Sequence, residues 1–115
     1  MSGTDHYEFF DAMVDYKAGK YAIALQKWES VMDVGPDTLS YYRGMALIGL
    51  GEDNEALQQL GEIVSTSPLH VKSQWYSIYL LIRMERYDEA LALLPSLPDS
   101  LHGYERVLEF LNSKQ

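Results

Sequence analysis

One short segment occurs three times along this chain, and its spacing constrains the fold more than any other feature. The copies are GKYAIALQKW at residues 19–28, GEDNEALQQL at 51–60 and ERYDEALALL at 85–94. Their central alanines, Ala24, Ala56 and Ala90, are 32 and 34 residues apart. A period of this size is typical of helical repeats, in which each unit is a pair of antiparallel helices. The sequence therefore predicts an all-α array of helical hairpins.

Apolar residues recur at helical spacing in seven segments, which glycines and prolines separate. The expected helices span about residues 5–19, 21–33, 38–50, 53–65, 69–84, 87–94 and 100–112. Asp5 followed by Glu8 has the spacing of a capping box, which predicts a helix start. Pro36 and Pro68 separate the hairpins, and Pro95 is expected to end the sixth helix early because proline lacks an amide donor.

A single domain is expected over residues 1–115, since a chain of this length can bury a core without disulfides or metals. The repeat units are predicted at about residues 5–36, 37–68 and 69–98. The seventh helix, at about residues 99–112, is predicted to be a cap, because a terminal repeat needs an element that covers its apolar side.

Small, bulky and proline residues recur at matching places in the three units. Small residues occupy the expected helix crossings at Ala12, Gly44, Ala24, Ala56 and Ala90. Bulky residues follow at Trp28, Leu60 and Leu94, then at Val31, Ile63 and Leu97, and Pro36 and Pro68 close the first two units. In this pattern the chain resembles the tetratricopeptide repeat (TPR) family over about residues 7–97. The resemblance implies a right-handed superhelical array of three antiparallel hairpins with a seventh capping helix.

The chain also departs from the family pattern. Glu8, Ser40 and Gln74 occupy the place of an early tryptophan, and Ile78 replaces the small residue of the third unit. Because a larger side chain at a crossing holds two helices apart, we expect an altered packing angle in the third hairpin.

The resemblance further implies a concave groove, lined by the first helix of each hairpin, that binds a partner. Its columns would be Phe9, Tyr41 and Trp75, then Met13, Met45 and Tyr79, then Tyr16, Ile48 and Ile82, with Lys17, Lys72 and Arg83 near the edges. Family members that clamp the C-terminal carboxylate of a chaperone tail use Lys and Asn in these columns, and this chain has no Asn there. An exposed stripe of aromatic residues would mark an interface, whereas the alternative is that the stripe packs in the core.

Composition argues against several classes of function. Nine Lys and Arg against seventeen Asp and Glu give a net charge of −8, so nucleic acid and anionic membrane surfaces would be repelled on average. No apolar run is long enough to insert into a membrane, and the chain has no cysteine. His6, His70 and His102 are far apart, and the carboxylates fall on expected polar faces. We therefore predict no catalytic residue, no cofactor and no metal site.

The expected function is that of a non-catalytic protein–protein interaction module, an adaptor that binds a short peptide or an amphipathic helix of a partner in the groove. The alternative is structural self-association, in which the same apolar face closes a homodimer or joins a larger assembly. As given, the chain is expected to be soluble. A cytoplasmic location is favoured, and an exported domain of a longer protein stays an open alternative.

Overall fold

The computed structural model describes residues 2–31 and 34–115, with side chains described from residue 7 onward. The helices are α1 (Ser2–Lys17), α2 (Tyr21–Trp28), α3 (Pro36–Gly49), α4 (Asp53–Gly61), α5 (His70–Arg83), α6 (Tyr87–Leu93), a short 3₁₀ helix η1 (Leu94–Ser96) and α7 (Tyr104–Asn112). No strand occurs among these residues. The predicted all-α fold is confirmed.

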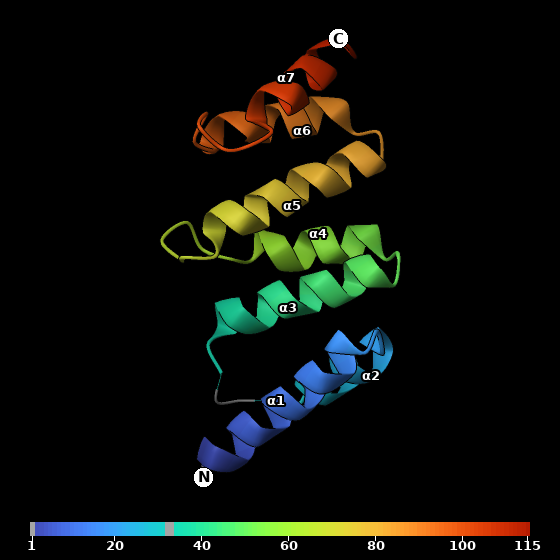
Figure 1. Cartoon of the computed structure of the whole chain (residues 1–115), viewed down its shortest axis with the longest axis vertical. Coiled ribbons are helices and arrows are strands. Elements are labelled where there is room, and N and C mark those ends of the chain that lie inside the picture. Colours follow the sequence, from blue (N-terminus) through green and yellow to red (C-terminus); the bar gives the residue numbers. More distant parts are fainter. Residues whose placement is uncertain (1, 32–33) are drawn as a thin grey trace.

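The helices stack in chain order along the long axis of a molecule that measures 51 × 27 × 20 Å (Figure 1). Each helix packs against the one before it and the one after it, from α1 against α2 to α6 against α7. The two ends of the chain therefore lie at opposite ends of the stack (Figure 1). Because most contacts are made between helices that follow one another in the sequence, the architecture is that of a helical repeat array.

The three hairpin turns share one backbone geometry. Gly19, Gly51 and Glu85 have positive φ angles of 81°, 78° and 60° at equivalent places. In each turn the following amide, of Lys20, Glu52 or Arg86, donates to a carbonyl five residues earlier at 2.8 to 2.9 Å. This is the Schellman arrangement that ends a helix with one left-handed residue. The third turn therefore adopts the same conformation as the others although its residue is not glycine.

Small residues allow the close crossings that the sequence pattern predicted. Ala12, Ala24, Ala56 and Ala90 are completely buried. A Cβ atom added at Gly44 would lie 2.8 Å from Leu60 Cδ2, closer than two carbon atoms can approach. A side chain at this position would therefore force the buried Leu60 side chain to move.

Several helix boundaries differ from the predicted ones. The second and fourth helices end at Trp28 and Gly61, not near residues 33 and 65, because the chain tightens into turns that hydrogen-bond three residues back. These turns place Val31 and Ile63 in the core. Residue 33, where the second helix was expected to end, lies outside the described residues.

The first and last helices also begin at other residues than expected. The first starts at Ser2 and not at Asp5, so the predicted capping box does not mark its start. The Asp5 side chain lies outside the described part of the chain. The seventh begins at Tyr104, because Gly103 has a φ of 89° and the preceding residues form turns. The sixth helix ends at Leu93 and continues as a 3₁₀ turn that contains Pro95.

The core consists of three clusters that follow one another along the stack. The first joins α1, α2 and α3 around Trp28, and the second joins α3, α4 and α5 around Leu60. The third joins α5, α6 and α7, with Leu94 and Leu111 nearly or fully buried. The seventh helix thus buries an apolar residue against the last hairpin.

Candidate functional site

Two residues of the expected groove lie in the core. Phe9 and Tyr41 are only 7% and 8% exposed. The Phe9 carbonyl accepts a hydrogen bond from the Trp28 indole N–H at 3.4 Å, and the Phe9 ring lies 6.0 Å from that of Tyr42. These two side chains therefore pack in the core, which is the alternative given for the stripe.

Aromatic packing explains why this part of the expected groove is filled. Tyr42 makes edge contacts with Tyr16 and Tyr41, at ring distances of 5.8 and 5.2 Å, and also lies against Trp28. Tyr41 in turn meets Tyr76 of α5 at 6.4 Å. Edge-to-face pairs of this kind stabilise a core beyond their buried area. The tyrosines that follow the expected column along the chain thus fill the space between α1, α3 and α5.

The other residues expected in the first two units are half-buried or isolated. Met13 and Tyr16 pack on the first core cluster, and Met45 and Ile48 on the second. Lys17 is exposed at the end of α1. Lys72 is also exposed, and its ammonium group lies 5.9 Å from the centre of the Tyr41 ring.

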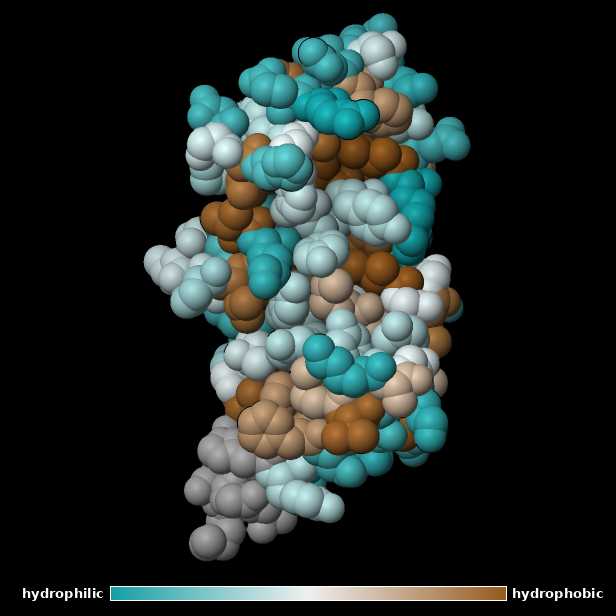
Figure 2. Space-filling view, in the orientation of Figure 1, coloured by the Kyte–Doolittle hydropathy of each residue, from teal (hydrophilic) through white to brown (hydrophobic). Residues whose placement is uncertain are grey.

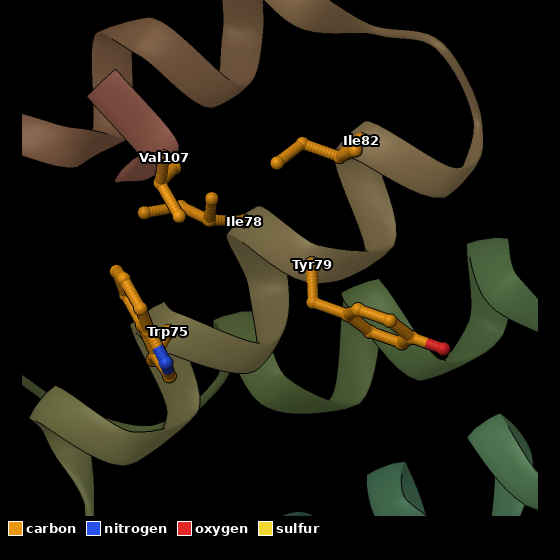
Figure 3. A pocket seen from close by; sticks show the side chains of 5 residues that line it. All are labelled: Trp75, Ile78, Tyr79, Ile82 and Val107. Atoms are coloured by element: carbon orange, nitrogen blue, oxygen red, sulfur yellow. The ribbon is translucent and has the colours of Figure 1, made fainter. Parts of the chain in front are cut away.

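An apolar pocket does open in the third unit, between α5 and α7 (Figure 3). Its volume is about 190 Å³, and it is lined by Trp75, Ile78, Tyr79, Ile82 and Val107. Ile78 lies in the middle of the view, between Trp75 and Ile82, and Val107 approaches from α7 (Figure 3). Trp75, Tyr79 and Ile82 are expected groove residues, so the structure brings together the third-unit part of the predicted set.

Ile78 and Val107 complete the pocket and were not among the expected site residues. Both had a signal in the sequence, since Ile78 replaces a small residue at a crossing and Val107 lies on the apolar face of the last helix. The position of Val107 depends on the turn before α7. There a Cβ atom added at Gly103 would lie 3.7 Å from the Trp75 ring, so the turn packs directly on the indole.

The rim of the pocket is held by an ion pair. The Arg83 guanidinium forms two hydrogen bonds to the Asp53 carboxylate of α4, with Nε donating at 2.9 Å. Its Nη1 also donates to the Tyr79 hydroxyl at 2.9 Å, while the guanidinium lies 5.1 Å from the centre of the Tyr79 ring. The hydrogen bonds from Arg83 lower the pKa of Asp53. Arg83, expected as a cation at the groove edge, is therefore paired, and it holds the Tyr79 ring in place.

Where the fold shifts a pKa, the shift is away from neutral pH. Burial, followed by the nearby tyrosines, raises the pKa of Tyr41 to about 12. The hydrogen bonds that the Lys27 ammonium donates to Asp11 and Asp15 raise the pKa of Lys27. Neither pKa is shifted toward the value that suits a proton-transfer residue at neutral pH.

Elsewhere on the surface, a larger hollow of about 470 Å³ lies between α4, α5 and α6, and it is partly polar because Gln74, Ser77 and Glu89 line it. Hydrophobic atoms reach the surface in several separate patches with hydrophilic residues between them (Figure 2). Among the described residues, no three His, Asp or Glu side chains come together in a way that could hold a metal ion. In the same part of the chain, no helix has the length and apolar character needed to cross a membrane.

The fold and the pocket define an all-α protein of stacked helical hairpins with one apolar hollow near its C-terminal end. No protein-family model matches the sequence, and none of the curated proteins compared with it is significantly similar.

Proposed function

We propose that the chain is a non-catalytic protein–protein interaction module of the TPR type, and that the pocket between α5 and α7 receives an apolar side chain of a peptide or amphipathic helix. The observation that carries this proposal is the pocket itself, whose five lining residues are all apolar or aromatic. An apolar pocket walled by aromatic rings is the usual setting for an anchor residue of a partner.

The size of the pocket favours an anchor over a small molecule. Its volume of about 190 Å³ is below the ~300–1,000 Å³ of typical small-molecule sites. A single leucine, methionine or phenylalanine side chain suits this pocket, because each is apolar like the pocket lining. Tyr79 is 46% exposed and held by Arg83, so it offers a rigid aromatic surface beside the anchor at low entropic cost.

Charge contributes less to this binding than the expected groove suggested. The Arg83 charge is already compensated by Asp53, and Lys72 lies against the Tyr41 ring away from the pocket-lining set. Binding at the pocket should therefore depend mainly on apolar contact and only weakly on salt concentration.

Filling the pocket tests the proposal without removing core atoms. Peptides that bind the wild-type chain would be selected from a displayed library of amphipathic helices, and their affinity for Val107→Phe would then be measured. The added ring should occupy the hollow and lower affinity at least tenfold, which corresponds to about 1.4 kcal/mol. Thermal unfolding of the variant would be followed alongside, and an unchanged melting temperature shows that the loss is local.

Val64→Phe is the matched control, because Val64 is 55% exposed and lies outside the pocket. It should leave peptide binding unchanged. Selected peptides that bind Val107→Phe as tightly as the wild type would show that the pocket is not the binding site.

A further inference from the structure

The outer face of α1 carries a stripe of exposed apolar residues. Tyr7 is 70% exposed, Phe10 64% and Val14 68%, whereas large apolar side chains are usually scattered singly on a surface. Their spacing of three and then four residues is that of the a and d positions of a coiled coil. A stripe this narrow fits one partner helix lying nearly parallel to α1.

The opposite face of α1 is already used by the fold. Phe9 and Ala12 belong to the first core cluster, where α1 packs on α2. The stripe residues are exposed, although the Phe10 ring still meets the Phe9 ring edge-on at 5.4 Å. The helix that carries them, α1, is the terminal helix of the stack (Figure 1). Among the described residues, the outer stripe therefore has no neighbouring helix.

The two ends of the array differ in the kind of side chain that they expose. At the C-terminal end, α7 exposes the charged residues Glu105, Arg106 and Glu109, and its exposed aromatic ring, Phe110, lies beneath the Lys114 ammonium. Repeat arrays need polar outer faces at their ends to stay in solution. The N-terminal end instead exposes two aromatic rings and a valine, which is the character of a contact surface.

We propose that this stripe, Tyr7, Phe10 and Val14 with Lys17, is a self-association surface on which α1 of a second copy packs antiparallel. In the antiparallel register that pairs a with d positions, Phe10 of one copy lies against Val14 of the other, and Tyr7 lies against Lys17. The pairing is two-fold symmetric and closes after two copies.

The charges on the stripe fit this register. Lys17 is exposed in the last turn of α1 and would stack on the Tyr7 ring of the second copy. The chain already uses such contacts, since the Lys114 ammonium lies 5.5 Å from the centre of the Tyr87 ring and 5.2 Å from that of Phe110. Beside the stripe, the single Lys27 ammonium lies 2.7 Å from Asp11 and 2.6 Å from Asp15, so it offsets one of the two carboxylate charges that a second copy would meet.

A head-to-tail contact between α1 and α7 of another copy fits less well, because the outer face of α7 is charged. The pairing of two α1 helices also keeps the rest of two molecules of net charge −8 apart.

The exposed area sets the strength of the contact. The three apolar side chains present roughly 350 Å² per copy, taking ~200 Å² for a whole aromatic side chain, against about 800 Å² per partner in a standard stable interface. The dimer should therefore be weak and should form only at high protein concentration. This inference is independent of the proposed peptide pocket, which lies at the other end of the array.

Sedimentation equilibrium over a wide range of concentrations tests the proposal. The wild type should pass from monomer to dimer, and Val14→Glu should stay monomeric where the wild type is dimeric. Val64→Glu is the matched control at an exposed apolar residue outside the stripe, and it should dimerise like the wild type. Lys17→Glu should weaken the dimer several-fold, and Lys17→Arg should preserve it.

Disulfide trapping tests the register, because the chain has no cysteine of its own. An oxidised mixture of Phe10→Cys and Val14→Cys should give the mixed dimer in excess over either disulfide homodimer, since these two positions face each other. A wild type that stays monomeric at the highest concentrations, or a dimer that Val14→Glu leaves intact, would overturn the proposal. Preferential trapping of Val14→Cys with itself would overturn the antiparallel arrangement.

Discussion

Glu85 offers a direct test of the repeat geometry, because it adopts a conformation that the other two hairpins assign to glycine. Its φ is 60°, while Gly19 and Gly51 have 81° and 78° at the equivalent places. A non-glycine residue in the left-handed region costs roughly 1–2 kcal/mol. No hydrogen bond of the Glu85 side chain offsets this cost among the described residues, and the side chain is exposed.

Replacing Glu85 by glycine should therefore stabilise the fold. The relief of backbone strain is partly offset by the greater entropy of glycine in the unfolded chain, about 0.4–1 kcal/mol. We expect a net gain of about 0.5–1 kcal/mol in the free energy of unfolding. For a domain of this size that raises the melting temperature by roughly 2–4 °C.

Urea unfolding followed by circular dichroism, together with a thermal scan, would measure the effect of Glu85→Gly. Only the midpoint should move, because the slope reports the surface exposed on unfolding. Gly19→Ala and Gly51→Ala are the matched reverse changes, since a Cβ atom at either glycine would meet no heavy atom within 4 Å. Each should lower the free energy of unfolding by about 0.5–1 kcal/mol, because backbone strain outweighs the entropy that the unfolded chain loses when glycine is replaced. A Glu85→Gly variant that is no more stable than the wild type would refute the reasoning.

Two further changes probe the core. Ala56→Leu should cost roughly 1–3 kcal/mol in urea unfolding, because Ala56 is completely buried at the crossing of α3 and α4; an unchanged midpoint would contradict this crossing. Tyr41 has a pKa raised to about 12 in the folded chain by burial, so its neutral phenol stabilises the fold fully below about pH 10, the value of an unfolded tyrosine. That stability should be lost as the pH rises from about 10 to 12, and the Tyr41→Phe variant should lose less. Equal losses of stability in both proteins over this pH range would show that the buried Tyr41 phenol is not responsible.

The hairpin arrangement could be predicted from the sequence because its determinants are local and repeated. Ala24, Ala56 and Ala90 mark the crossings, and Gly19 and Gly51 mark two turns, all at a nearly constant period. A small residue at a crossing has one physical reason, the close approach of two backbones, so the pattern leads directly to the contact. The membership in the TPR family stays a prediction.

The groove could not be predicted as well, because exposure depends on residues outside its columns. The family resemblance assigned Phe9 and Tyr41 to the columns, but it does not show that the rings of Tyr42 and Tyr76 would pack against them. The pocket in turn depends on where α7 begins. Gly103 sets that start through its positive φ and brings Val107 over Ile78, a tertiary effect with no local signature in the helical pattern.

The positions of the two proposed surfaces suggest how they would act together. The helix that carries the stripe, α1, lies at one end of a stack 51 Å long, and α5 and α7 lie toward the other (Figure 1). The pocket is lined by residues of α5 and α7. An antiparallel pair of α1 helices would therefore leave both pockets free, at the far ends of the dimer. A partner carrying two anchor segments on a linker long enough to span them would gain avidity from the dimer, because its second binding event becomes intramolecular. Val14→Glu should then remove the avidity while leaving the affinity for a single anchor peptide unchanged, and Val107→Phe should remove both.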